Sequence, residues 1–339
     1  MASDSILYLS ERQVARALEE IDAVDAIASA LAAHARGETT LPAEAHLGWD
    51  WHGEALRSLS MPAVIGSSAG VKVINANPSN PARRLPRASG LTILFSTETA
   101  RPICIMEGAR ISCVRTAAVT AVAAEQLGSH PVERLAIIGA GALALCHLHL
   151  LIRRLRELRE IRVYDVRPRR AAILAGRWRA DGPRVGVCGS PERAIREADV
   201  IVPVTTTTSG YIRHEWLKPG ALLVNVSLDD PLPEVVLRAD KVFVDDWQLV
   251  ATDERRLLGR MLREGMIRGP DEDAGRSPSA ARPVDGELGQ LLVGVREGRA
   301  HADEVILVNP FGLAIEDLAV AQEVYERATR LGLGVQLER

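Results

Sequence analysis

Residues 135–144 constrain the fold of this chain most, because they combine an apolar run with a glycine pattern. The run leads into Gly139-Ala-Gly141, and the small Ala144 follows. In a strand–turn–helix unit, the first glycine permits a tight turn, the second lets the backbone approach a pyrophosphate, and a small third residue lets the helix pack closely. Residues 161–165 predict a second strand ending in Asp165, where a carboxylate binds ribose hydroxyls. The pattern predicts a dinucleotide site that favours NAD over NADP.

The remaining chain predicts an α/β fold with more than one domain. Further apolar runs recur with helical segments between most of them, as in an open parallel sheet; they lie at 185–187, 200–204, 222–226, 241–244 and 304–308. Before this region, residues 11–36 predict an amphipathic helix, 60–105 a small sheet and 111–125 an alanine-rich helix. The tail from Gly312 is apolar at helical spacing and is expected to pack on the first domain.

Composition narrows the class of protein. The chain has 339 residues, enough for two cores, and its net charge of −3 offers no basic field for nucleic acid. It begins without a basic and apolar leader and has no apolar run of about 18 residues, so we expect a cytoplasmic protein without membrane segments. The histidines and cysteines lack HExxH or CxxC spacing, so no metal site is expected, and the cysteines are expected to be buried free thiols.

Polar residues follow several predicted strands, and ligands of open parallel sheets bind beyond the carboxyl ends of the strands. Thr205 and Thr206 follow one strand and could contact the ribose or nicotinamide. Ser227, Asp229 and Asp230 follow the next, and Asp245 and Asp246 follow another. A carboxylate beside a nicotinamide can act as a general base toward an amine or water. Each aspartate could instead cap the helix that follows it.

Two cations in the first domain occupy apolar surroundings. Lys72 lies inside an apolar strand, where a buried ammonium needs an anionic partner. Arg115 shares a helix face with Ile111, Ala118 and Val122 and therefore points inward. Such an arginine forms either a structural ion pair or a bidentate clamp for a substrate carboxylate, and we favour the clamp.

Four separated motifs resemble the ornithine cyclodeaminase/mu-crystallin family over nearly the whole chain. They are Val71-Lys72-Val-Ile-Asn75, Arg115-Thr-Ala-Ala118, Gly139-Ala-Gly141 and Gly312-Leu-Ala-Ile-Glu-Asp317. The resemblance implies a Rossmann-type parallel-sheet domain that binds NAD, at 129–312. It also implies a smaller α+β domain for substrate binding and dimerisation, built from both chain ends at 1–128 and 313–339. The implied substrates are amino acids or imines, bound by a homodimer.

Within the family, the motifs Arg57-Ser-Leu-Ser-Met-Pro62 and Asn225-Val-Ser-Leu-Asp-Asp230 look most like dehydrogenases of 2,3-diaminopropionate biosynthesis. Those enzymes oxidise N-(2-amino-2-carboxyethyl)-L-glutamate with NAD and water, and the product feeds siderophores and peptide antibiotics. Ornithine cyclodeaminases carry a lysine in the stretch after the corresponding strand, whereas this chain has Asp229-Asp-Pro-Leu-Pro233. Phe95-Ser-Thr stands where those dehydrogenases lead us to expect a more polar Asn-Asp turn, so the substrate stays open. The alternatives are an ornithine cyclodeaminase, alanine dehydrogenase or ketimine reductase, and a nucleotide-binding, crystallin-like protein without turnover.

Motifs and resemblance together assign the site residues. Asp229 and Lys72 are the expected catalytic residues, and Arg57, Lys72, Arg87 and Arg115 are expected to bind the substrate carboxylates. Extra arginines at 83, 84 and 87 suit a substrate with more than one carboxylate, although a solvated basic loop is the alternative. The expected NAD contacts are Arg115, Thr116, Gly139, Ala140, Gly141, Ala142, Leu143, Asp165, Thr205, Thr206, Ser227 and Asp229.

Overall fold

The computed structural model describes residues 5–178, 182–272 and 281–338. The chain divides into two compact units. Unit 1 comprises Met1–Arg115 and Leu313–Arg339, and unit 2 comprises Thr116–Gly312. The division falls inside helix α3 (Gly108–Leu127), so these units differ from the domain limits expected from the sequence mainly in the assignment of this helix.

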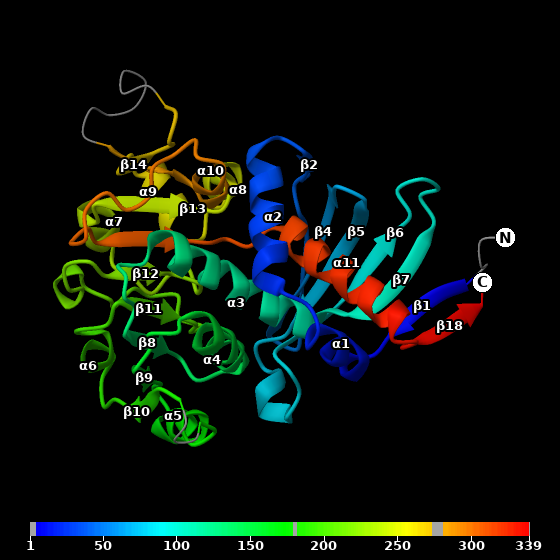
Figure 1. Ribbon diagram of the computed structural model, residues 1–339, viewed down its shortest axis with the longest axis horizontal. Helices are drawn as coiled ribbons and strands as arrows, with labels where there is room; N and C mark the ends of the chain where they lie inside the picture. Colours follow the sequence, from blue (N-terminus) through cyan, green and yellow to red (C-terminus); the bar gives the residue numbers. More distant parts are fainter. Residues whose placement is uncertain (1–4, 179–181, 273–280, 339) are drawn as a thin grey trace. The chain divides into compact units, whose positions relative to one another are not determined.

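Unit 1 has an α+β fold, and its strands form one eight-stranded sheet (Figure 1). The strand order is β18-β1-β7-β6-β5-β4-β2, with β3 paired to β4. Among these pairs, β1 and β7 are parallel and the others are antiparallel. The strands are β1 (Ser5–Leu9), β2 (Thr39–Thr40), β3 (Ala45–Trp51), β4 (Glu54–Ile65), β5 (Ser68–Ala76), β6 (Ala88–Phe95), β7 (Pro102–Glu107) and β18 (Val335–Glu338). The other elements are α1 (Glu11–Leu18), α2 (Ala23–Ala35), the 3-10 turn η1 (Asn80–Arg83) and α11 (Ala314–Arg330).

Helix α11 packs against α2, β4 and β5, so the chain's last long helix completes the core of unit 1 (Figure 1). Gly70 allows α11 to approach β5 closely. A Cβ atom at Gly70 would lie 3.0 Å from Leu318 Cδ2 and would overlap the carbonyl oxygen of Ile93. Lys72 lies two residues further along β5 and is buried like Gly70, as expected for residues on one face of a strand. The missing side chain therefore brings α11 down onto the face that carries Lys72.

Unit 2 is a parallel eight-stranded sheet in the order β10-β9-β8-β11-β12-β17-β13-β16. The strands are β8 (Arg134–Ile138), β9 (Glu160–Tyr164), β10 (Arg184–Val187), β11 (Val200–Pro203), β12 (Leu222–Val224), β13 (Lys241–Val244), β16 (Gly286–Glu287) and β17 (Ile306–Asn309). A separate pair joins β14 (Ile267–Arg268) to β15 (Arg282–Pro283). The central strands β11, β12 and β17 are buried throughout, which matches their continuous apolar sequences.

Helices connect most of the strands of unit 2 (Figure 1). They are α4 (Ala142–Arg154), α5 (Pro168–Ala175), α6 (Pro191–Ile195), α7 (Pro233–Arg238), α8 (Trp247–Thr252), α9 (Leu257–Arg263) and α10 (Leu288–Leu292), with the 3-10 turn η2 (His214–Trp216). The strand order reverses beside β8, since β9 lies on one side and β11 on the other. This is the position where doubly wound sheets bind ligands. The predicted α/β class with a Rossmann-type sheet is confirmed.

Two further expectations concern the cysteines and the membrane. Cys104 and Cys188 are free, but Cys113 and Cys146 are disulfide-bonded, so the expectation of four free thiols is wrong for these two. Spacing in the sequence does not reveal which cysteines the fold brings within bonding distance. Among the described residues, no helix combines the length and apolar character needed to cross a bilayer.

Candidate active site

The glycine turn after β8 has the geometry that the sequence predicts. Gly139 adopts a φ of +101°, and a Cβ atom there would lie 2.9 Å from the carbonyl oxygen of Val204. Its N–H donates to the carbonyl oxygen of Tyr164, which ties the turn to the end of β9. Gly141 precedes the first turn of α4, and a Cβ atom there would meet no atom within 4 Å. Open space next to a helix N-terminus suits a pyrophosphate.

Asp165 follows β9 and holds the glycine turn. Its Oδ2 accepts a hydrogen bond from the Ala140 N–H at 2.8 Å, and Oδ1 accepts one from the Arg167 N–H at 2.7 Å. Each oxygen retains a second lone pair that can accept a hydroxyl. The turn, the N-terminus of α4 and this carboxylate therefore fit a dinucleotide.

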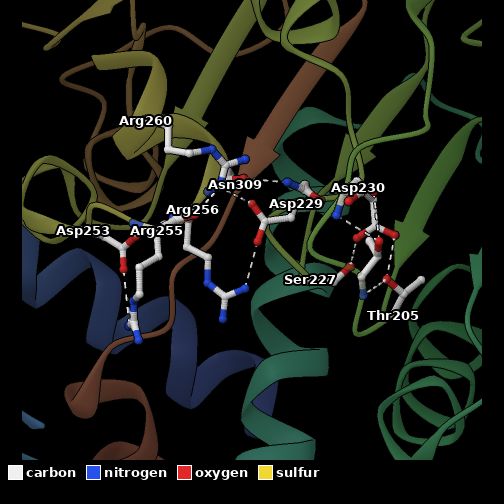
Figure 2. Close-up of polar contacts among 12 residues, drawn as sticks. Thr205, Ser227, Asp229, Asp230, Asp253, Arg255, Arg256, Arg260 and Asn309 are labelled. Atoms are coloured by element: carbon white, nitrogen blue, oxygen red, sulfur yellow. Dashed lines mark hydrogen bonds and ion pairs between the residues drawn. The ribbon is translucent and has the colours of Figure 1, made fainter. Parts of the chain in front are cut away.

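The adjacent residues Asp229 and Asp230 have different surroundings (Figure 2). Asp230 is fully buried and accepts hydrogen bonds from the hydroxyls of Thr205, Tyr211 and Ser227. Burial raises the pKa of Asp230, and these hydrogen bonds oppose the rise. Thr205 and Ser227 are thus engaged in a structural network, whereas Thr206 is exposed.

Asp229 is 3% exposed and pairs with two arginines (Figure 2). Arg256 Nη1 donates to its Oδ2 at 2.9 Å, and Arg260 Nη1 lies 3.3 Å from its Oδ1. Among the described residues, none donates a hydrogen bond to Oδ1. Leu228, just before it, has a φ of +73°, an unfavourable conformation for a branched side chain. A buried carboxylate on a strained turn, with one oxygen still able to accept, can take a proton from a bound amine.

Asp245 and Asp246 mainly support the backbone. Asp246 caps α8 by accepting from the Leu249 N–H, which is the capping role that the sequence left open. Asp245 is buried and accepts from the N–H groups of Gly312 and Asp246. Burial raises its pKa to about 6.

In unit 1, Lys72 and Arg115 meet two carboxylates of α11. Lys72 is 4% exposed, and its Nζ lies 2.9 Å from the Asp317 carboxylate and 3.1 Å from Ser112 Oγ. Arg115 contacts Glu316 at 2.7 Å through Nη1 and Asp317 at 3.2 Å through Nε. Burial lowers the pKa of Lys72, and the attraction of Asp317 opposes this. The structural ion pair expected as an alternative is present, and the group of two cations and two anions is neutral.

The other predicted substrate residues lie at the surface of unit 1. Arg57 is half-buried on β4, and Arg87 is exposed just before β6. Arg83 forms an exposed two-point ion pair with Glu54, in keeping with the alternative of a solvated loop. Thr116, Ala142 and Leu143 lie on α3 and at the start of α4. Arg57, Lys72, Arg87 and Arg115 belong to unit 1, and the remaining predicted site residues belong to unit 2.

The sequence motifs did not identify four charged residues of these groups as site candidates. Arg256 and Arg260 had no recognisable motif, because their meeting with Asp229 depends on how α9 packs. Glu316 and Asp317 did have a signal, since a helix that is otherwise apolar on its core face carries two acids there, both completely buried. Buried acids require cationic partners.

Fold and glycine turn together define a dinucleotide-binding α/β protein with an additional α+β unit. The chain belongs to the ornithine cyclodeaminase/mu-crystallin family, whose model matches residues 6–331. The family expected from the sequence motifs is confirmed.

Individual relatives are similar over almost the entire chain. N-((2S)-2-amino-2-carboxyethyl)-L-glutamate dehydrogenase of Staphylococcus aureus is 33% identical over 322 residues, covering 93% of this chain and 92% of that protein. The crystal structure of CmnK has a TM-score of 0.90 and 37% identity, covering 99% of this chain and 98% of that one. An archaeal alanine dehydrogenase dimer with bound NAD has a TM-score of 0.83 and 27% identity, covering 98% and 99%.

Proposed function

We propose that this NAD-dependent oxidoreductase of amino-acid derivatives oxidises N-(2-amino-2-carboxyethyl)-L-glutamate to 2-oxoglutarate and L-2,3-diaminopropionate. The observation that carries the proposal is the buried Asp229 carboxylate beyond the carboxyl end of the parallel sheet. Its Oδ1 lies 3.3 Å from Arg260 Nη1 and accepts no hydrogen bond from the described residues. The similarity to the Staphylococcus aureus dehydrogenase supports this substrate. The arginines beside Asp229 and the cations of unit 1 suit a substrate with three carboxylates.

In the proposed function, separate groups of residues bind the substrate carboxylates and NAD. Lys72 and Arg115 bind one substrate carboxylate, and Glu316 and Asp317 hold these two cations in place. Arg57 and Arg87 bind a further carboxylate. In this proposal the turn at Gly139 and Gly141, the N-terminus of α4 and Asp165 hold NAD. Thr116, Ala140, Ala142 and Leu143 are further contacts of NAD, and Thr205, Thr206 and Ser227 contact its nicotinamide half.

Asp229 performs the proton transfers. NAD held by the Gly139 turn and Asp165 would supply the acceptor for the hydride of the glutamyl α-carbon. Asp229 takes the proton from the secondary amine as the carbon–nitrogen double bond forms. Asp229 releases this proton to solvent and is a carboxylate again. It then removes a proton from the water that attacks the imine carbon and passes it to the imine nitrogen. As the carbon–nitrogen bond breaks, it transfers the remaining hydroxyl proton to the departing amine, which leaves the ketone. The products are 2-oxoglutarate, L-2,3-diaminopropionate, NADH and a proton, so atoms and electrons balance.

The proposal also covers the oligomeric state of the enzyme, its location in the cell and the use of its product. We propose a homodimer acting in the cytoplasm, with the diaminopropionate entering siderophore or peptide-antibiotic biosynthesis. Strand β3 supports the dimer, because its apolar Leu47, Trp49 and Trp51 are exposed.

The test is the appearance of NADH absorbance at 340 nm with NAD and single candidate substrates. We expect oxidation of N-(2-amino-2-carboxyethyl)-L-glutamate, with 2-oxoglutarate and diaminopropionate found by mass spectrometry. Alanine and ornithine serve as comparison substrates. Faster conversion of ornithine to proline would establish a cyclodeaminase instead, and faster oxidation of alanine an alanine dehydrogenase.

A further inference from the structure

Asp229 has more positive charge around it than a buried carboxylate requires. Two guanidinium groups, those of Arg256 and Arg260, face this one carboxylate at 2.9 and 3.3 Å. Among the described residues, neither arginine pairs with a second carboxylate. One ion pair neutralises a buried aspartate, so Asp229, Arg256 and Arg260 by themselves carry one excess positive charge. The cations and anions around Lys72 in unit 1, by contrast, balance.

Local contacts hold the backbone that carries Arg256 and Arg260. Asp253 Oδ1 accepts hydrogen bonds from the N–H groups of Arg255 and Arg256, each at 2.7 Å, immediately before α9. Gly259 lies against the same turn, and a Cβ atom there would lie 2.8 Å from the carbonyl carbon of Asp253 and would also overlap its carbonyl oxygen. Only glycine lets α9 pack this closely. The two arginines are therefore preorganised beside Asp229 before any substrate binds.

Arg256 has unused hydrogen-bond donors, and its side chain is partly exposed to solvent. A guanidinium carries five N–H donors, and among the described residues Arg256 uses only Nη1, toward Asp229. Its side chain is 29% exposed, and that of Arg260 is 41% exposed, whereas that of Asp229 is 2% exposed. Figure 2 shows both guanidinium groups directed at Asp229, while the neighbouring Arg255 turns toward Asp253. A ligand carboxylate can thus reach Arg256 without displacing Asp229.

We infer that Arg256 and Arg260 form a binding site for a second carboxylate of the substrate, next to the proton-accepting Asp229. The paired guanidinium groups compensate the catalytic carboxylate and a substrate carboxylate together, which lets two anions lie close to one another. The site makes dicarboxylate substrates preferred over simple amino acids. This inference rests on the proposed function for its choice of a dicarboxylate amino-acid derivative.

The test measures binding rather than turnover. Calorimetric titration of the NADH-loaded protein compares 2-oxoglutarate with pyruvate, which lacks the second carboxylate. We expect Arg256→Gln to raise the Kd of 2-oxoglutarate by about 10- to 100-fold, the range for a lost charge-assisted hydrogen bond, and to leave the Kd of pyruvate unchanged. Arg255→Gln is the matched control, because Arg255 lies one residue away, is 60% exposed and pairs with Asp253. It should change either Kd by less than about fivefold, as for an exposed ion pair.

Arg256→Lys, which keeps the charge but not the planar fork, is the second variant and should weaken 2-oxoglutarate binding while preserving pyruvate binding. Equal weakening of both ligands by both Arg256 variants would show a structural role through Asp229 and overturn the inference. So would equal effects of Arg255→Gln and Arg256→Gln, or no binding of 2-oxoglutarate to the unaltered protein. If the protein binds 2-oxoglutarate through Arg256 but does not oxidise the glutamate adduct, only the proposed function fails.

Discussion

Lys72 Nζ lies 2.9 Å from the carboxylate of Asp317, although 245 residues separate them in the chain. Burial lowers the pKa of Lys72 from its usual 10.5, and Asp317 raises it. In the proposed function, Lys72 binds a substrate carboxylate, which it can do only while it is protonated. We therefore predict that KM rises with pH through a midpoint below 10.5, as the ammonium loses its proton. Because Asp317→Asn removes a contribution that raises the pKa, this midpoint should move to lower pH. Steady-state KM measured across the alkaline range tests the prediction.

The control for this prediction is Ser112→Ala, which removes a hydrogen bond of Lys72 but no charge. It should move the midpoint less than Asp317→Asn does. In Lys72→Arg the alkaline rise of KM should vanish over the same range, since a guanidinium stays protonated. A midpoint that moves to higher pH in Asp317→Asn would contradict the assignment.

The nucleotide-binding unit could be predicted from the sequence because its determinants are local. The turn at Gly139, the start of α4 and the acid at the end of β9 follow one another within a single βαβ unit. Strand order beyond that unit could not be predicted. Strand β17 enters between β12 and β13, an insertion decided by packing of buried strands that are all similarly apolar.

The charged partners of the site were not predictable for the same reason. The sequence marks Lys72 as a buried cation, but its partner comes from the other end of the chain, brought close by the small residue Gly70. Arg256 reaches Asp229 because Gly259 admits α9 to the preceding turn. Such contacts depend on the final packing of helices, which no local pattern encodes.

Asp229→Asn should lower turnover on the order of a hundredfold or more while preserving NAD binding, because it removes the proposed general base. Asp230→Asn should act differently. It places an amide where Thr205, Tyr211 and Ser227 all donate hydrogen bonds, which costs about 1–3 kcal/mol in the free energy of unfolding. Stopped-flow kinetics and urea denaturation separate the two effects. Loss of turnover in Asp230→Asn alone would move the catalytic assignment by one residue.

Asp165 should make the enzyme prefer NAD to NADP, since a 2′-phosphate close to this carboxylate would be repelled. Fluorescence titration with NADH and NADPH measures the preference, and Asp165→Ser should narrow it. Because Asp165 also holds the N–H groups of Ala140 and Arg167, the variant should weaken NADH binding as well. Tighter binding of NADPH to the unaltered protein would reverse the assignment, with Arg167 and Arg169 as the responsible cations.

Strand β3 should form part of the proposed dimer interface. Leu47, Trp49 and Trp51 alternate along it, so they share one face, and they are 62%, 42% and 64% exposed. Trp51→Glu should shift the protein toward the monomer in analytical ultracentrifugation, because the interface would then bury a charge. Val295→Glu is the control, since Val295 is equally exposed, at 67%, but lies in unit 2. Dissociation by both variants, or by neither, would exclude β3 as the interface.

Arg87 should recognise a substrate carboxylate that alanine and ornithine lack. It is exposed, and among the described residues it pairs with no carboxylate, whereas the charge of Arg83 is taken by Glu54. A charge-assisted hydrogen bond contributes roughly 1.5–3 kcal/mol, so Arg87→Ala should raise KM for the glutamate adduct by about 10- to 100-fold. Arg83→Ala should change this KM much less, and Arg87→Ala should leave KM for alanine unchanged if alanine is oxidised at all. Arg115→Ala should impair both substrates. If Arg87→Ala leaves the kinetics of the adduct unchanged, Arg87 does not belong to the substrate site. Arg256 and Arg260 would then be the candidates for binding the additional carboxylate.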